Sequence, residues 1–391
     1  MLKEMTQTCP VLFGAGAIQE TGNRLKALGV NKALCICDPG IKSTGLVDKI
    51  VGIVKAAGVG VVVFDKVQPD PPDSVVDECA KLARDEKVEG IFAIGGGSSL
   101  DTAKATSVLL RNPGSIRDYL SARNGGAVNK KPGAPLVVIP TTAGTGSEVS
   151  KFTVISDTEK DFKDGIYTTA TLAILDPEVT LSLPPHITAS TAFDAFAHSV
   201  EGMTTILTDP KSEVLGLAAI SKITKWLPVV MKDGSNLEGR SELSVASNFA
   251  GMVLNDGVVH IGHGFAHSLG ALYHVEHGTG CALALPVCVE FTASAAPEMT
   301  KKIGQAMGIE FKDSAKPEEI GKKVADSIRD LMKKSGIKSV KDLKLPRDEF
   351  VAKMSADIFA KQSHVTNLCV RPPKDEGEVK QFVADIYDKY Q

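Results

Sequence analysis

The sequence lacks the features that would place this protein in several broad classes. Its 44 lysines and arginines are nearly balanced by 47 aspartates and glutamates, with no long block of one sign, which argues against a surface for nucleic acid. No apolar run approaches the roughly 18 residues that a membrane helix requires, and the first eight residues include an acid and no apolar signal core. With no repeat or low-complexity segment visible, the sequence predicts an ordinary globular protein, and we expect it in the cytoplasm.

Cysteine is scarce and is not arranged as a redox pair or a disulfide framework. The seven cysteines are odd in number and scattered along the chain. Cys35 and Cys37 have the wrong spacing for a redox Cys-x-x-Cys motif, and alternation along a strand would direct both side chains to one face. The pattern is typical of small buried apolar residues in a reducing compartment.

Length and hydrophobic pattern indicate two domains. At 391 residues the chain exceeds one typical domain. Its first half alternates amphipathic helices with short apolar runs that suit strands buried on both faces. The alternation predicts a doubly wound, mostly parallel α/β sheet. The clearest strands are expected near residues 32–37, 61–64, 89–94 and 136–139.

The second half changes character after Pro184 and Pro185. The strand signal nearly disappears and helical periodicity takes over. We therefore predict an α/β domain over residues 1–184 and an all-helical domain over residues 185–391. Its helices are expected at residues 187–203, 210–231, 240–255, 263–273, 296–307, 317–335, 347–360 and 375–389.

Two loops in the first half follow predicted strands. Residues 95–99, Gly-Gly-Gly-Ser-Ser, lie between a strand and a helix. Glycines let backbone N–H groups approach a phosphate, and the helix N-terminus adds positive potential. This loop therefore predicts a phosphate site. A plain tight turn is the alternative. Residues 140–148 are also small and rich in hydroxyls. Their composition leaves open whether they line a ribose or nicotinamide or form only a flexible loop.

Asp38 ends an early strand and is a candidate acceptor for an adenosine ribose. A carboxylate at this place would also repel a 2′-phosphate, which favours NAD over NADP. Turn chemistry, in the sequence Asp38-Pro39-Gly40, is the alternative explanation.

Histidines and one aspartate dominate the second half. Five of the eight histidines fall within eighteen residues: His260, His263, His267, His274 and His277. Residues four apart lie on one helix face, so Asp194 and His198 can converge on one point. One carboxylate with several neutral imidazoles is a ligand set for zinc or ferrous iron. Hydrogen-bonded structural histidines are the alternative, and spacing does not decide which of the five would bind.

Taken in order, these motifs resemble the iron-containing (group III) alcohol dehydrogenase family over nearly the whole chain. The resemblance implies a dinucleotide-binding domain at residues 1–184 and a metal and substrate domain at residues 185–391. It also implies an NAD(H)-dependent, metal-dependent alcohol dehydrogenase or aldehyde reductase for a small alcohol or aldehyde. Such an enzyme would be a homo-oligomer, a dimer or a multiple of dimers, without nucleic-acid or membrane partners. The matching segments are residues 95–104, 140–148, 173–177, 194–201, 263–270 and 277–278.

The resemblance also implies roles that spacing left open. His267 would relay a proton, with orientation of a metal ligand as its alternative role, whereas His274 and His260 would be pocket or structural residues. The metal, Fe2+ with Zn2+ as the alternative, would be bound by Asp194, His198, His263 and His277. The NAD-binding residues would be Asp38, Gly96, Gly97, Ser98, Asp101, Thr141, Thr142 and Thr145, with Asp101 capping the helix.

The C-terminal part departs from the family pattern. The family often shows Asn-Pro-Arg where this chain has Cys-Val-Arg at residues 369–371. If His364 and Arg371 face the substrate, they favour a short aldehyde with a polar or anionic group; a structural salt bridge of Arg371 is the alternative. Glycerol-dehydrogenase-like or dehydroquinate-synthase-like enzymes on the same fold, and a non-catalytic metal- or nucleotide-binding module, are the alternative functions.

Overall fold

The structure, a computed structural model, describes residues 3, 5–6, 8–121, 131–160 and 162–390. These residues form two compact units. The α/β unit lies within Gln7–Thr142 and Gly146–Leu181, and the helical unit lies within Met1–Thr6, Ala143–Thr145 and Ser182–Gln391.

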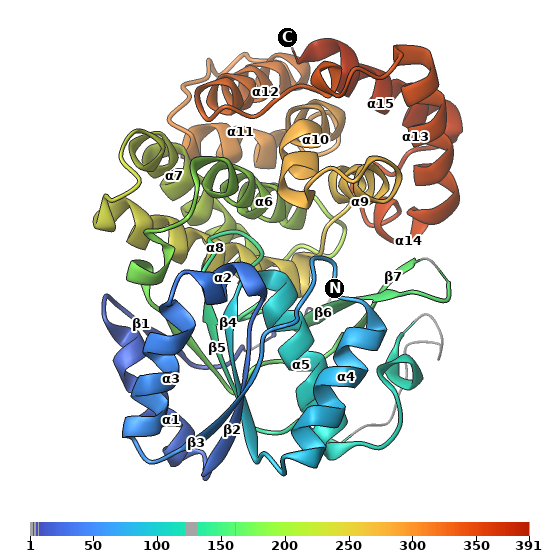
Figure 1. Cartoon of the computed structure of the whole chain (residues 1–391). Helices are drawn as coiled ribbons and strands as arrows, with labels where there is room; N and C mark the ends of the chain where they lie inside the picture. The colour runs from blue at the N-terminus through green and yellow to red at the C-terminus, as the bar shows by residue number, and fades with distance from the viewer. Residues whose placement is uncertain (1–2, 4, 7, 122–130, 161, 391) are drawn as a thin grey trace. The chain divides into compact units, whose positions relative to one another are not determined.

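The α/β unit is built on a six-stranded parallel sheet with the order β1-β8-β5-β4-β2-β3 (Figure 1). The four predicted apolar runs are confirmed as strands. An edge strand of three residues was not predicted, because so short a segment shows no readable period. The strands are β1 (Val11–Phe13), β2 (Lys32–Ile36), β3 (Gly60–Phe64), β4 (Gly90–Gly95), β5 (Leu136–Pro140) and β8 (Leu172–Leu175).

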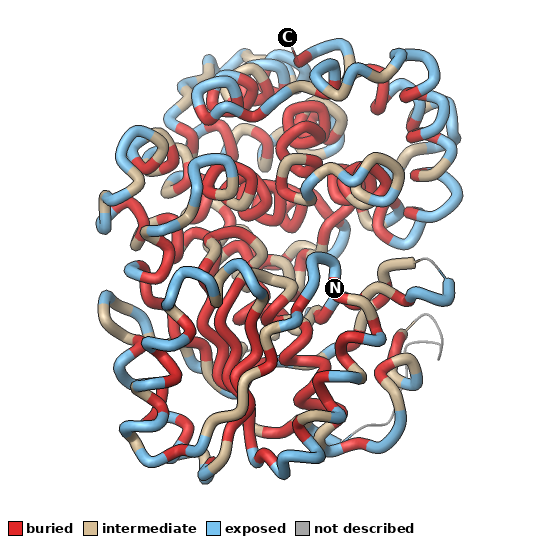
Figure 2. Tube along the Cα trace, in the orientation of Figure 1, coloured by how far each residue is buried: buried red, intermediate tan, exposed pale blue. Residues whose placement is uncertain are grey.

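Helices cover both faces of this sheet, which confirms the doubly wound prediction. Side chains alternate across a strand, so Leu34 enters the core on one face, and Cys35 and Cys37 enter the core on the other. Figure 2 shows the central strands buried along their length. The covering helices are α1 (Thr21–Ala27) and α3 (Leu46–Ala56) on one face, and α4 (Asp73–Asp85) and α5 (Gly97–Arg111) on the other (Figure 1).

A second, antiparallel sheet in the α/β unit was also not predicted. It pairs β6 (Phe152–Asp157) with β7 (Phe162–Tyr167). Residues 163–165 of β7 are Lys-Asp-Gly. These residue types are depleted in strands, so the local sequence does not predict a strand here.

The helical unit contains all eight predicted helices and one long helix that was missed. The missed helix, α10, is buried on all sides along most of its length and contains Pro286; without a polar face it shows no helical period. The helices are α6 (Pro185–Met203), α7 (Pro210–Lys232), α8 (Leu237–Gly257), α9 (Ile261–Tyr273), α10 (His277–Thr292), α11 (Pro297–Ala306), α12 (Pro317–Lys334), α13 (Arg347–Lys361), α14 (Ser363–Thr366) and α15 (Glu376–Lys389).

One described helix, α7, is long and apolar enough by length and composition to cross a membrane. It packs along α6 and α8. Its residues Ala219, Ile220 and Ile223 belong to the hydrophobic core of the helical unit. Because a core helix passes the same test, this feature is weak evidence for a membrane span.

Candidate metal and cofactor sites

Three helices of the helical unit bring an acid and several imidazoles together. Asp194 and His198 lie one turn apart on α6, His263 lies in the first turn of α9, and α10 begins at His277. Helix α10 packs against both α6 and α9. We call the set of Asp194, His198, His263 and His277 the Asp194 cluster.

One carboxylate oxygen is common to the whole cluster. Asp194 Oδ1 lies 3.6 Å from His198 Nε2, 3.5 Å from His263 Nε2 and 3.6 Å from His277 Nε2. The same oxygen is buried and makes no hydrogen bond with any described residue. Ligand atoms 2.0–2.2 Å from one tetrahedral ion are separated by roughly 3.3–3.6 Å. The spacing therefore fits donors that share a divalent ion better than donors that bond to one another.

Burial and charge give Asp194 and His198 the protonation states that a metal requires, whereas burial alone would lower the pKa of His263 but its contacts with Cys281, Glu201 and Asp194 raise it. Burial alone would raise the pKa of Asp194, but the imidazoles of His198, His277 and His263 hold this pKa below its usual range. Burial lowers the pKa of His198 although Asp194 opposes the shift. An ionised carboxylate and a neutral imidazole are metal-binding forms.

Glu201 orients His263, a role that the sequence did not reveal. His263 Nδ1 lies 2.7 Å from Glu201 Oε1, and Glu201 Oε2 accepts from the backbone N–H groups of His260 and His263 at 2.7 and 3.3 Å. This arrangement directs Nε2 of His263 toward Asp194, as carboxylate partners of metal-binding histidines do. Burial opposes ionisation, but the charges of His263 and His260 lower the pKa of Glu201 to about 2.

His267 lies beside the cluster rather than within it. Its ring stacks on that of His277, with centroids 5.4 Å apart and an interplanar angle of 20°. Its Nδ1 lies 3.4 Å from Oε1 of Gln362, a buried residue that was not singled out from the sequence. His267 itself is only partly buried, so an imidazole in this position is suited to exchanging protons.

Four further histidines lie outside the cluster: His260, His274, His364 and the exposed His186. His260 is fully buried; its Nδ1 accepts from the N–H of Ile261 at 2.9 Å and its Nε2 lies 2.9 Å from Thr204 Oγ1. Both ring nitrogens are therefore occupied, in keeping with the structural role implied above. His274 is exposed and ends α9 in a left-handed conformation with φ 55°, and His364 is exposed on α14.

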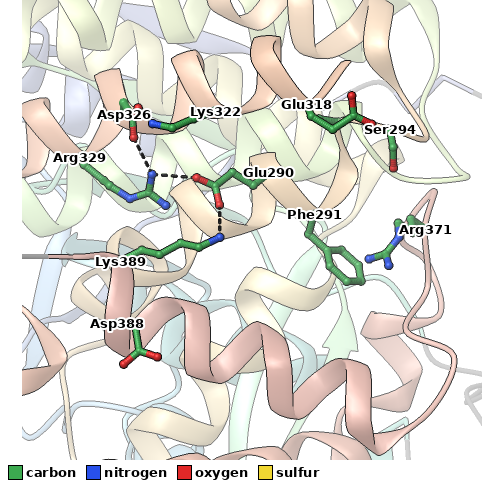
Figure 3. Close-up of a pocket in the computed structure, with 11 residues that line it drawn as sticks. Glu290, Phe291, Ser294, Glu318, Lys322, Asp326, Arg329, Arg371, Asp388 and Lys389 are labelled. Carbon is green, nitrogen blue, oxygen red and sulfur yellow. Dashed lines mark hydrogen bonds and ion pairs between the residues drawn. The ribbon is translucent and has the colours of Figure 1, made fainter. Parts of the chain in front are cut away.

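Arg371 also lies away from the cluster, contrary to the hypothesis that it contacts the substrate. It lines a cavity of about 790 Å³ among α10, α12 and α15 (Figure 3). Its guanidinium carbon lies 3.9 Å from the centre of the Phe291 ring, and its Nη2 donates to Glu378 Oε1 at 3.0 Å. Phe291 follows His277 on α10 by fourteen residues, which is roughly 21 Å of helix. The structural salt bridge is therefore the observed arrangement.

The glycine loop of the α/β unit connects β4 directly to the N-terminus of α5. Gly95 has φ 151°, and a Cβ at this position would lie 2.5 Å from Ser99 Oγ. The N-cap residue Gly96 supplies no side-chain cap. The N–H groups of the first turn, including those of Gly97 and Ser98, have no partner within the helix, so the loop suits an anion such as a phosphate.

Asp38 has the turn role that the sequence offered and also lies beside the glycine loop. Its Oδ1 accepts from the N–H of Ile41 at 3.0 Å and so caps α2 (Pro39–Ser43). Its Oδ2 lies 3.4 Å from Ser99 Oγ, beside the glycine loop, because β2 and β4 are neighbours in the sheet. Asp38 is therefore near the place where a dinucleotide's phosphates would lie.

Asp101 does not cap α5, which corrects the role expected for it. It lies in the second turn of the helix, where Oδ1 accepts from Ser147 Oγ at 2.6 Å and Oδ2 accepts from the N–H of Val154 at 3.1 Å. The two carboxylate oxygens thus hold the end of the second loop and strand β6, which follows it. Lys104 supports the same segment from the next turn of α5.

The threonines of the second loop are divided between the units. Thr141 donates its N–H to Gly95 O at 2.9 Å. The side chain of Thr142 borders Gly96, where an added Cβ would lie 3.3 Å from its Cγ2. Thr145 belongs to the helical unit. Within the α/β unit, the structure therefore brings Thr141 and Thr142 to the glycine loop.

Replacing Gly278 with alanine is expected to weaken metal binding at least tenfold. A Cβ at Gly278 would lie 2.3 Å from the backbone oxygen of Ser190 on α6, so the first turn of α10 must move and carry His277 with it. Overpacking of this kind also costs about 1–3 kcal/mol of stability. Metal titration and thermal denaturation measure both effects. Gly52→Ala is the control, because a Cβ there meets nothing within 4 Å; equal behaviour of the two variants would contradict the prediction.

Family comparisons match both halves of the chain. A family model described as "Iron-containing alcohol dehydrogenase" matches residues 10–177. A second, described as "Fe-containing alcohol dehydrogenase family, C-terminal", matches residues 188–382.

Individual proteins of similar sequence or structure cover most of the chain. Choline dehydrogenase of Bacillus subtilis is 39% identical over 304 residues, which are 77% of this chain and 75% of that protein. NAD-dependent methanol dehydrogenase of Bacillus methanolicus is 34% identical over 76% of this chain and 78% of that protein. The crystal structure of a 1,3-propanediol oxidoreductase superposes with a TM-score of 0.90 at 29% identity, and covers 99% of this chain and 100% of that one.

Proposed function

The chain belongs to the iron-containing alcohol dehydrogenase family, and we propose that the Asp194 cluster is its reaction centre. The protein is an NAD-dependent oxidoreductase that acts on an alcohol or aldehyde. The proposed centre rests on the position of Asp194 Oδ1, which is buried, has no hydrogen-bond partner among the described residues and lies 3.5–3.6 Å from three imidazole nitrogens.

Each member of the centre has a separate task in this proposal. Asp194, His198, His263 and His277 would hold the ion, Fe2+ or alternatively Zn2+. When bound, the metal supplies Lewis-acid polarisation of the substrate oxygen, and NAD(H) supplies the hydride acceptor or donor. Glu201 holds His263 in the required tautomer. His267 moves a proton between the substrate oxygen and solvent.

The α/β unit would bind the dinucleotide. The N–H groups at Gly96, Gly97 and Ser98 support a phosphate at the start of α5. Asp38 would accept from the adenosine ribose. The remaining members of the proposed site are Asp101, Thr141, Thr142 and Thr145, of which Asp101 acts through Ser147 and Val154.

Substituting His267 with glutamine is expected to lower kcat about a hundredfold and leave the metal content unchanged. General acid–base groups typically contribute about 10²–10⁴-fold, and His267 lies outside the set of atoms around Asp194. Metal analysis and the pH dependence of kcat measure the two effects. Loss of metal together with activity would instead favour its alternative role, orienting a metal ligand.

Substituting Asp38 with glycine is expected to relax the preference for NAD(H) over NADP(H) at least tenfold. A carboxylate accepts from a free 2′-hydroxyl and repels a 2′-phosphate. The ratio of kcat/KM for the two cofactors measures the effect. Asp38→Asn is the matched variant, because it keeps a cap for α2 while removing the charge. Equal use of both cofactors by the unmodified protein would contradict the assigned role.

The reaction is tested by oxidation of NADH, followed at 340 nm, with Fe2+ or Zn2+ and a panel of short aldehydes. The panel contains a neutral aldehyde and one of similar size with a terminal acid group, since the substrate class is part of the proposal. We expect turnover that a chelator abolishes. Binding of NADH without turnover across the panel would favour a non-catalytic module.

We further propose that the enzyme is a cytoplasmic homodimer. Support for the compartment comes from the seven cysteines, all within the described residues, which form no disulfide and suit a reducing environment. Sedimentation of the purified protein tests the oligomeric state; a monomer at micromolar concentration would contradict it.

A further inference from the structure

A buried thiol reaches the Asp194 cluster from α10. Cys281 lies one helical turn after His277 and is 1% exposed. Its Sγ lies 3.6 Å from Nε2 of His263 and 3.6 Å from Nε2 of His277. The ligand atoms of Asp194, His263, His277 and Cys281 all lie within 4.8 Å of one another.

These distances match those between donors on one ion. A sulfur about 2.3 Å and a nitrogen about 2.1 Å from one ion are separated by roughly 3.1–3.8 Å at the angles of about 90–120° that occur among five donors, and 3.6 Å lies within this range. The thiol has one proton and can donate to only one of the two equidistant nitrogens. Asp194 Oδ1, buried and without a hydrogen bond among the described residues, belongs to the same group of atoms. The arrangement thus presents oxygen, nitrogen and sulfur donors around one point.

We propose that Cys281 binds the metal of the Asp194 cluster as a thiolate. The inference rests on the proposed function, because it assigns one more donor to the same ion. Coordination forms a metal–sulfur bond and breaks the S–H bond, and the proton leaves to solvent. A thiolate favours zinc and cobalt over harder ions, so this donor gives the site a higher affinity for Zn2+ and Co2+ than oxygen and nitrogen alone would.

A second group of potential ligands is formed by Glu201, His260 and Cys288. In this group the imidazole and the carboxylate are already engaged in hydrogen bonds. His260 Nδ1 accepts from the N–H of Ile261, and Glu201 bonds to the backbone at His260 and to His263. Cys288 Sγ lies 3.8 Å from His260 Nδ1. Because hydrogen bonds already occupy the imidazole and the carboxylate, Cys288 serves as a matched control: it is a buried thiol on the same helix, next to a histidine whose two ring nitrogens have other partners.

The test uses the full-length protein, stripped of metal and loaded with Co2+. Its absorption spectrum separates visible d–d bands, which report any bound Co2+, from the near-ultraviolet charge-transfer band of a cobalt–thiolate bond. We expect both features in the unmodified protein and in Cys288→Ser. In Cys281→Ser and Cys281→Ala we expect d–d bands without the thiolate band, and an affinity for Zn2+ at least tenfold lower in competition with a chromophoric chelator.

Two outcomes would overturn the inference. In the first outcome, the unmodified protein shows d–d bands without the thiolate band, or Cys281→Ser retains that band. Cys281 is then only a buried hydrogen-bonding thiol, and the assignment of the proposed centre still holds. If the unmodified protein shows no d–d bands at all, the ligand assignment fails together with the inference. Because the spectrum of the unmodified protein decides between these cases, the test holds even if a Cys281 variant does not fold.

Discussion

His263→Ala is expected to lose most of its bound metal and to lower turnover more than a hundredfold, with NAD(H) binding largely retained. His263 contributes Nε2 at 3.5 Å from Asp194 Oδ1, and its loss leaves a buried carboxylate facing a gap. Disturbing only the partners of metal ligands costs about 10–100-fold, so removing a ligand costs more. The glycine loop belongs to the other unit, which is why NAD(H) binding is retained. Metal analysis, steady-state kinetics and NADH fluorescence titration measure the three quantities.

Two further variants provide comparisons for His263→Ala, one with a milder expected loss of metal and one with no expected loss. Glu201→Gln keeps His263 in place and removes only the charge of its partner, so a loss of metal affinity of about 10–100-fold is expected. His186→Ala removes an exposed histidine at the start of α6 and should leave metal content and turnover unchanged. Full metal content and activity in His263→Ala would show that the ligand assignment is wrong. His277→Ala is expected to behave like His263→Ala.

Lys104→Met is expected to destabilise the α/β unit by about 3–5 kcal/mol, as breaking a buried ion pair does. Lys104 is fully buried, and its Nζ donates to the backbone oxygens of Ser147, Ser150 and Phe152 at 3.0, 3.2 and 2.7 Å. It also lies 3.2 Å from Asp101 Oδ1. Methionine keeps the length of the side chain but leaves three carbonyl groups and a carboxylate without their cation. Denaturant unfolding followed by circular dichroism measures the loss.

The matched control for Lys104 is Lys81→Met. Lys81 forms an exposed pair with Asp85 one turn away on α4, and exposed pairs of this kind contribute well under about 1 kcal/mol. A Lys104→Met protein as stable as Lys81→Met would mean that water replaces the cation, which contradicts the structural role. A second consequence is weaker NADH binding, because residues 147–152 lose the contacts that hold them to α5.

Local pattern predicted the elements whose sequence carries a period or a continuous apolar run. Strands β4 and β5 are apolar throughout, and β2 is apolar after Lys32, because helices cover both faces of the sheet. Helix α12 separates its buried and exposed residues along the helical period, and so was readable. Helix α10 is buried on all sides, so its sequence contains no such contrast, and the element that carries His277 and Cys281 was missed.

The residues of the candidate centre divide in the same way, into those that the local sequence predicted and those that only the fold brought together. The sequence by itself determined that Asp194 and His198 share one face of a helix, because that relation is set by four residues of local geometry. Only the tertiary structure decided that Glu201 supports His263, 62 residues away, and that Gln362 faces His267 across 95 residues. It also placed Cys281 among the imidazoles, and Arg371 on Phe291 far from them. Such contacts depend on how helices pack, and helix packing is decided by side-chain shape across the whole core, which no local pattern records.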